Sequence, residues 1–123
     1  MLPPLKIFQV EADGEVAVLK PVGDATAFRY QDLHMEANSI RSYISRGKIK
    51  HLVIDLSELN YFGSEFIGSL VSMAREVRNR RGIACMCAAS DQMLDVLENM
   101  SLFKLWPYFQ TRPEALAHID EKT

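Results

Sequence analysis

The chain has 123 residues, a formal net charge of −2 and a hydrophobic fraction of 48%. These values exclude an intrinsically disordered chain, which combines low hydrophobicity with high net charge. They also argue against a general nucleic-acid binder, because phosphate contacts need a basic face. No apolar run approaches the roughly 20 residues that cross a membrane. The length predicts a single domain over residues 1–123, with its core at about residues 5–120.

Two short strands open the chain. Residues 5–10 and 15–20 are rich in apolar residues, and residues 11–14 between them contain an Asp-Gly step. Such a step between two strand-like segments is a strong β-hairpin signal. Pro21 then ends the second strand, and Asp24 is a turn or N-cap residue before a longer segment.

A helix and a central strand are expected next. Four apolar residues recur at the spacing of one helical face: Leu33, Ala37, Ile40 and Ile44. Residues 51–56 form a nearly continuous apolar run, which is typical of a parallel strand covered on both faces.

A loop over residues 57–63 leads to a second helix that starts near Ser64 and is closed by Gly82. Its predicted buried stripe is Phe66, Ile67, Leu70, Val71, Ala74 and Val77. The arginines at its end, Arg75, Arg78, Arg80 and Arg81, are either a docking patch or, as we favour, a solvated helix end that complements the dipole.

The remaining residues complete an alternating pattern. Residues 83–88 form another apolar strand, Ser90 or Asp91 caps a third helix, residues 108–110 form a short strand, and Thr111 caps a last helix. The sequence therefore predicts an α/β fold: a mixed sheet of four to five strands that opens with a β-hairpin and packs against about four helices.

Residues that could carry catalysis or bind a metal are sparse. Cys85 and Cys87 lie two residues apart in an apolar run and are expected to be small buried hydrophobic residues in a reducing cytoplasm. His34, His51 and His118 have no partner at ligand or triad spacing, and no phosphate-binding glycine loop occurs. Because no signal peptide is visible, we expect a cytoplasmic protein. Because catalytic and metal-binding motifs are absent, we expect that it is not an enzyme and holds no metal or cofactor.

Asp55 stands at the end of the central strand, where open α/β sheets place their sites. One interpretation is an acid beside a metal or phosphate, as in receiver domains. We favour a carboxylate that accepts hydrogen bonds from loop amides, because a receiver needs an acidic pair after its first strand and here a hairpin is expected.

Ser64 is the most informative candidate residue. It follows Gly63 at the expected start of the second helix, where free N–H groups and the helix dipole favour negative charge. A phosphate on Ser64 would be stabilised there, as Glu65 in the first turn already is. The simpler alternative is that Ser64 only caps the helix.

Four segments, in this order, resemble the STAS family, the fold of bacterial anti-sigma-factor antagonists. Residues 18–24 resemble its second strand and acidic turn, and residues 52–57 its central strand ending in Asp-Leu-Ser. Residues 61–68 resemble the motif aromatic-x-Asp-Ser-Ser/Thr-Gly-Leu-Gly, and residues 97–116 the C-terminal pattern that ends in Glu-Ala-Leu. The resemblance covers roughly residues 5–120.

The resemblance implies a regulatory protein–protein interaction module. In that family the Ser after the motif Asp is the phosphoacceptor, and Ser64 is the matching residue. The implied partner is an anti-sigma factor that is also a serine kinase of the histidine-kinase-like ATPase type, released when Ser64 is phosphorylated. Self-association stays open, and no contact with nucleic acid and no membrane insertion are expected. The candidate partner contacts are Asp24, Asp55, Ser57, Asn60, Tyr61, Phe62, Gly63, Glu65 and Gly68.

Three residues depart from the family motif. Gly63 stands where the family has Asp, Glu65 where it has Ser or Thr, and Phe66 where it has Gly. Gly63 and Glu65 favour an alternative, a non-switching STAS subunit of a stressosome-like scaffold or of a lipid-transport ABC complex. A third interpretation is a small nucleotide-binding α/β domain in which Ser64 and the aspartates Asp24 and Asp55 share a pocket.

Overall fold

The computed structural model describes residues 5–22, 30–46, 48–59, 64–101 and 106–122, without the side chains of Tyr30, Ser64 and Glu65. The predicted order of helices and strands is confirmed within these ranges. The elements are β1 (Phe8–Asp13), β2 (Val16–Pro21), α1 (Tyr30–Ser45), β3 (His51–Asp55), α2 (Ser64–Asn79), β4 (Ala84–Cys87), α3 (Asp91–Asn99), β5 (Tyr108–Phe109) and α4 (Arg112–Lys122).

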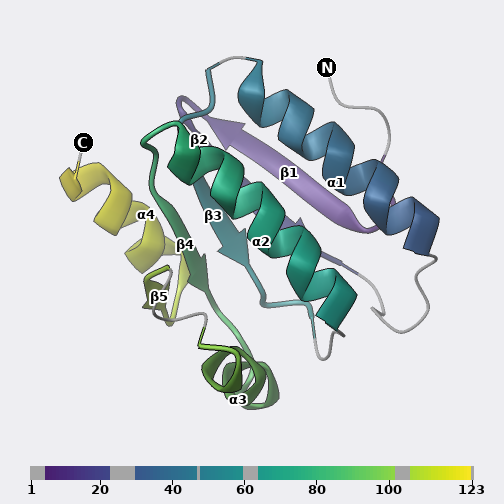
Figure 1. Cartoon of the computed structure of the whole chain (residues 1–123). Helices are drawn as coiled ribbons and strands as arrows, with labels where there is room; N and C mark the ends of the chain where they lie inside the picture. Colours follow the sequence, from purple (N-terminus) through teal and green to yellow (C-terminus); the bar gives the residue numbers. More distant parts are fainter. Residues whose placement is uncertain (1–4, 23–29, 47, 60–63, 102–105, 123) are drawn as a thin grey trace.

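The five strands form one mixed sheet in chain order, β1-β2-β3-β4-β5. β1 is antiparallel to β2, whereas β2, β3, β4 and β5 are parallel neighbours. α1 and α2 lie side by side on one face of the sheet, and α3 lies beyond the C-terminal end of β4 (Figure 1). The C-terminal ends of the parallel strands therefore meet at one edge, as the sequence indicated for the candidate site.

The opening hairpin is confirmed, but its predicted boundaries were wrong. Residues 11–13 belong to β1, because Asp13 pairs with Val16 and Glu11 with Val18. The turn is therefore only Gly14 and Glu15. Gly14 adopts a φ of 60°, a left-handed conformation that glycine takes without steric cost and that suits a two-residue hairpin turn.

α4 covers the second face of the sheet, packing against β3, β4 and β5. Because side chains alternate along a strand, Leu52 and Ile54 of β3 join the large core under α1 and α2, whereas Val53 faces α4. Cys85 and Cys87 belong to the smaller core under α4, so their predicted burial is confirmed.

The predicted apolar stripes of α1 and α2 are largely correct. All four residues predicted for α1 are buried, and α2 buries every predicted residue except Val71, which is only partly buried. Three residues at the same helical spacing were missed. Met73 and Ser69 are buried on α2, and Glu36 is buried on α1 at 7% exposure.

Glu36 ties the N-terminal segment to α1. Its carboxylate accepts hydrogen bonds from the backbone N–H groups of Lys6, Ile7 and Phe8 at 3.0, 2.9 and 3.2 Å. Phe8 lies opposite Pro21 in the sheet, and β1 is an edge strand. The carboxylate thus satisfies buried donors that no further strand pairs with.

The end of α2 differs from the prediction in one residue. The left-handed residue is Arg81, with φ of 66°, and not Gly82. The N–H groups of Arg81 and Gly82 donate to the carbonyls of Arg78 and Val77, the hydrogen-bond pattern of a Schellman motif. Gly82 serves close packing instead, because an added Cβ would lie 1.7 Å from the Lys50 carbonyl oxygen.

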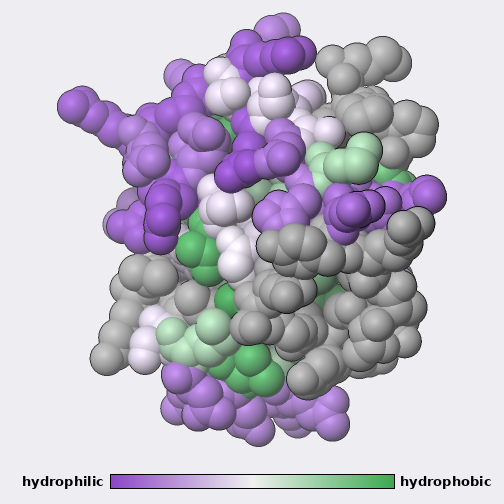
Figure 2. Space-filling view, turned by 45° about the vertical axis from the view of Figure 1, so that its right-hand side comes forward, coloured by the Kyte–Doolittle hydropathy of each residue, from purple (hydrophilic) through white to green (hydrophobic). Residues whose placement is uncertain are grey.

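The described surface is mainly hydrophilic on the side shown in Figure 2, where hydrophobic residues reach the surface only in small areas. Met35 and Met100 are the large apolar residues with high exposure among the described residues. No helix in the described ranges is long and apolar enough to span a membrane.

Candidate functional site

The candidate site lies where β3 gives way to α2. Residues 56–59 continue from β3, and α2 begins at Ser64, as predicted. The first turn of this 16-residue helix leaves backbone N–H groups without intrahelical partners, and the dipole adds partial positive charge there. This end of α2 is therefore electrostatically suited to a negative group.

Asp55 anchors the start of the loop that leads to Ser64. Its Oδ1 accepts a hydrogen bond from the backbone N–H of Ser57 at 2.9 Å, which confirms the favoured interpretation of this carboxylate. Its Oδ2 accepts from Arg112 Nε at 2.8 Å and lies 2.8 Å from Nη2 of the same guanidinium. Arg112 also reaches Glu11 of β1, with Nη1 3.3 Å from Oε2.

This network explains the charge state of Asp55. Burial, at 5% exposure, raises the pKa of the carboxyl, but hydrogen bonds from Ser57 and Arg112 and the positive charge of Arg112 outweigh it. The net effect is a pKa below the ordinary value for aspartate. Asp55 is thus a charged group whose oxygens are already engaged by the protein's own backbone and side chains.

The surface of α2 offers two observations about partner contact. Gly68 is exposed, and an added Cβ would meet no atom within 4 Å. Packing within the chain therefore does not require a glycine here, and the absence of a side chain leaves the backbone of α2 accessible at this position. Phe66, which replaces the family's Gly, points inward at 3% exposure and packs on Phe8 with ring centroids 5.6 Å apart. The bulky side chain therefore does not obstruct the outer face of α2.

The arginines at the end of α2 form a solvated, basic surface. Arg75, Arg78, Arg80 and Arg81 are exposed, and a cleft of about 300 Å³ lies between Arg75, Arg78 and Trp106. Nη1 of Arg80 donates to the carbonyl oxygen of Ile44, in the last turn of α1. Arg80 therefore complements the negative end of α1, a role that the sequence assigned only to the dipole of α2.

The structure brings together only some of the predicted site residues. Asp55 and Ser57 are in contact, and Gly68 lies on the exposed side of α2. Asp55 nevertheless points toward α4, whereas α2 covers the opposite face of the sheet. The other predicted contacts lie outside the described residues, in whole or in their side chains: Asp24, Asn60, Tyr61, Phe62, Gly63, Ser64 and Glu65. Contact of any of these residues with a partner stays a prediction.

Two residues of the Asp55 network were missed by the sequence analysis, Arg112 and Glu11. Arg112 lies 57 residues after Asp55, and Glu11 lies 101 residues before Arg112. No local pattern links such residues, since the register of the sheet and the docking of α4 bring them together. Only the position of Arg112, at the start of a predicted helix near the same sheet edge, could have suggested it.

The buried cysteines and His51 are structural. Burial raises the pKa of both Cys85 and Cys87 to about 12, which keeps them as thiols. Nδ1 of His51 accepts a hydrogen bond from the Ile83 N–H at 3.0 Å, and burial lowers the pKa of this ring. Among the described residues, no group of three or more His, Cys, Asp or Glu side chains could hold a metal ion.

Comparison with known proteins identifies the family to which this fold belongs. The model of the STAS domain matches residues 8–115, which is most of the chain. The chain belongs to the STAS family. The predicted resemblance and the predicted fold are therefore confirmed.

Solved STAS structures share this fold. The anti-sigma factor antagonist SpoIIAA in its unphosphorylated form is 18% identical, with a TM-score of 0.77 over 93% of this chain and 96% of that one. The phosphorylated form of the Bacillus cell-fate determinant SpoIIAA is 19% identical, with a TM-score of 0.71 over 91% and 98%. A STAS protein from Planctomyces limnophilus is 24% identical, with a TM-score of 0.75 over 92% and 97%.

Proposed function

We propose that this chain is an anti-sigma-factor antagonist. It binds an anti-sigma factor that is also a serine kinase of the histidine-kinase-like ATPase type, through the segment 57–64 and the exposed side of α2. Phosphorylation of Ser64 by that kinase breaks the complex. The observation that carries the proposal is the start of α2 at Ser64, directly after β3 and its loop, in a STAS fold.

The electrostatics of α2 support this role. A phosphate on Ser64 adds about −1.5 to −2 charges at the positive end of the helix dipole, so the modified chain keeps its fold. A partner surface that fits a neutral hydroxyl must then desolvate this charge and accommodate its bulk. SpoIIAA, of the same fold, has been solved in both phosphorylated and unphosphorylated forms.

The test is to incubate the chain with ATP and a kinase of this type encoded beside its gene. We expect a complex without phosphorylation and a mass increase of one phosphoryl group on Ser64 as the complex dissociates. Ser64→Ala stays unmodified and bound, whereas Ser64→Glu lowers the affinity by about tenfold or more. Ser72→Ala is the matched control, since Ser72 lies on the same helix and its hydroxyl donates to Ser69 within it. The proposal is overturned if the unmodified chain forms no complex with the kinase and takes up no phosphate.

A second candidate is a non-switching STAS subunit of a larger assembly, such as a stressosome-like scaffold or a lipid-transport ABC complex. It is favoured by Glu65 at the second position of α2, a fixed negative charge beside the acceptor. For this function, Ser64→Ala and the unmodified chain bind the partner equally, with or without ATP. Loss of binding after phosphorylation would reject it.

A further inference from the structure

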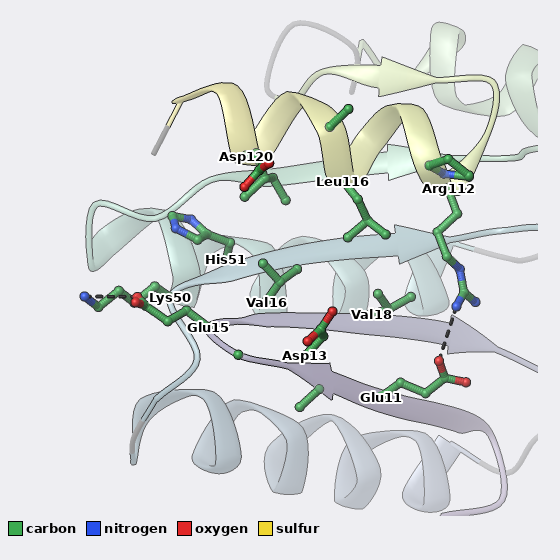
Figure 3. Close-up of a pocket in the computed structure, with 15 residues that line it drawn as sticks. Glu11, Asp13, Glu15, Val16, Val18, Lys50, His51, Arg112, Leu116 and Asp120 are labelled. Atoms are coloured by element: carbon green, nitrogen blue, oxygen red, sulfur yellow. Dashed lines mark hydrogen bonds and ion pairs between the residues drawn. The ribbon is translucent and has the colours of Figure 1, made fainter.

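A groove opens on the second face of the sheet, the face opposite α1 and α2. α4 packs on β3, β4 and β5, and the groove of about 1050 Å³ lies between α4 and the β1–β2 hairpin (Figure 3). This volume lies just above the roughly 300–1,000 Å³ of pockets for drug-sized ligands, so the groove has room for several amino-acid residues. The groove is therefore large enough to hold part of a partner chain.

The centre of the groove is apolar. The side chains of Val16 and Val18 from β2 face Leu116 of α4 across it (Figure 3). Val16 and Leu116 are only partly buried, so a ligand could cover apolar surface there. The apolar lining is completed by Ala12, Pro113, Ala117 and Ile119.

The charged residues of the groove are mainly acidic. Four carboxylates and two cations give a net charge of −2, equal to that of the whole chain. The charged residues are Glu11, Asp13, Glu15, Asp120, Lys50 and Arg112. His51 also lines the groove and adds no charge at neutral pH, because burial lowers its pKa.

The two cations are occupied by ion pairs at opposite ends of the groove (Figure 3). Lys50 Nζ lies 3.0 Å from Glu15 Oε2, and Arg112 is held by Glu11 and the buried Asp55. Asp13 lies between these two pairs (Figure 3). The groove therefore combines an apolar centre with an excess of negative charge, which complements a ligand that has both apolar and cationic groups.

We propose that this groove is a second docking surface, and that its occupant is a basic segment of a partner protein, with leucine-like side chains between lysines or arginines. The apolar side chains cover Val16, Val18 and Leu116, and a cation lies against Asp13. The proposal does not rest on the proposed function of Ser64, because the residues that line the groove and those of α2 lie on opposite faces of the sheet.

The test uses two blocked pentapeptides, Lys-Leu-Lys-Leu-Lys and Glu-Leu-Glu-Leu-Glu, titrated into the ¹⁵N-labelled full chain. We expect the lysine peptide to shift the amide signals of Val16, Val18 and Leu116, and to bind more weakly as salt is added. The glutamate peptide should leave these signals unchanged. No shift with the lysine peptide, shifts confined to other surfaces, or an equal response to both peptides would overturn the proposal.

Asp13→Lys and Asp95→Lys form a matched pair of variants, because they change the net charge equally. Asp13 is exposed in the groove, whereas Asp95 is exposed on α3. We expect Asp13→Lys to weaken the lysine peptide at least about fivefold relative to Asp95→Lys, as loss of a surface charge pair implies. Equal affinities would overturn the proposal, as would signal changes that follow protein concentration without peptide, which would indicate a second copy of the chain in the groove.

Discussion

Two neighbouring residues at the end of α2 restrict substitution in different ways. Arg81 adopts the left-handed conformation, φ 66°, which costs a residue with a Cβ about 1–2 kcal/mol. Gly82 has no such φ but has no space for a side chain, because the Lys50 carbonyl and Val77 lie against it. The sequence indicated that Gly82 is the left-handed residue that closes α2, whereas in the structure the left-handed residue is Arg81, one position earlier.

Arg81→Gly should therefore stabilise the protein by about 0.5–1 kcal/mol, since the gain in the folded state exceeds the added entropy of the unfolded chain. Urea unfolding followed by circular dichroism measures the change. Arg75→Gly, in the exposed middle of α2, is the control and should cost about 1 kcal/mol. A loss of stability in Arg81→Gly would contradict the assignment of its strain.

Glu36 illustrates what one buried carboxylate does for an edge strand. It accepts three backbone N–H groups, from Lys6, Ile7 and Phe8. An amide of the same shape has one acceptor oxygen. It can keep the Ile7 and Phe8 N–H groups, which share Oε1, but it turns its own N–H groups toward the Lys6 N–H at Oε2. The charge and the two oxygens of Glu36 are therefore both needed.

Glu36→Gln should destabilise the protein by about 1–3 kcal/mol, because the Lys6 N–H loses its acceptor and the Ile7 and Phe8 N–H groups lose a charged one. Hydrogen exchange at the Ile7 and Phe8 amides should accelerate more than exchange in β3. Glu98→Gln, at an exposed residue of α3, should change the free energy of unfolding by less than about 0.5 kcal/mol. Unchanged exchange at Ile7 and Phe8 would show that the carboxylate does not hold this segment.

At the scale of helices and strands, the Asp55–Arg112 contact joins the start of α4 to the end of β3. The folded state holds the pKa of Asp55 below its ordinary value, so folding favours the charged form. The stabilisation is present at neutral pH, above the unfolded pKa of about 3.9, and is lost as the pH falls through the folded pKa.

Asp55→Asn should lower the free energy of unfolding by about 1–3 kcal/mol at pH 7. The difference from the unmodified chain should shrink below about pH 4, because Asp55 is then protonated first in the unfolded chain and, at still lower pH, in the folded protein. Urea unfolding between neutral and acid pH measures it, with the exposed Asp95→Asn as control. A difference that stays constant to low pH would exclude the charged contact as its source.

The elements were predictable because their signals are local. The apolar spacing from Leu33 to Ile44 and the Asp-Gly step determine a helix and a hairpin within a few residues of chain. Glu36 carried a signal as well, since it stands three residues from Leu33 and four from Ile40. Its burial escaped prediction because the N–H groups that donate to its carboxylate come from another segment, residues Lys6, Ile7 and Phe8.

The candidate site was less predictable than the fold. The start of α2 at Ser64 follows from local residues, but the ion pair of Asp55 with Arg112 depends on how α4 docks. The inward direction of Phe66 depends in the same way on its packing against Phe8. Side-chain direction within an element can be estimated from periodicity, whereas contacts between distant elements need the assembled sheet.

For the whole molecule, the sheet separates two cores of unequal size. The core under α1 and α2 takes in most of the buried apolar residues, whereas the core under α4 is much smaller and is closed by Ala115 and Ile119. A short helix over a small core opens at a lower free energy than the rest of a domain. Cys85 and Cys87, both fully buried beneath α4, report such opening.

Thiol labelling in urea concentrations below the unfolding midpoint should therefore modify Cys85 and Cys87 faster than global unfolding permits. Ile119→Ala and Ile40→Ala form a matched pair, one in each core. When the two variants are compared at urea concentrations that give them the same global stability, the cysteines should be labelled faster in Ile119→Ala than in Ile40→Ala. Equal rates would mean that α4 opens only when the whole molecule unfolds.

Arg112 belongs to two surfaces at once. It lines the groove beside α4, and through Asp55 it holds the backbone of Ser57, where the segment toward Ser64 starts. A ligand that draws this guanidinium away from Asp55 removes one support of the carboxylate that binds the Ser57 N–H, so binding in the groove is coupled to the start of the segment toward Ser64. Thermodynamic reciprocity then relates the two sites. By whatever factor a groove ligand changes the equilibrium of modification at the start of α2, that modification changes the affinity of the groove for its ligand by the same factor.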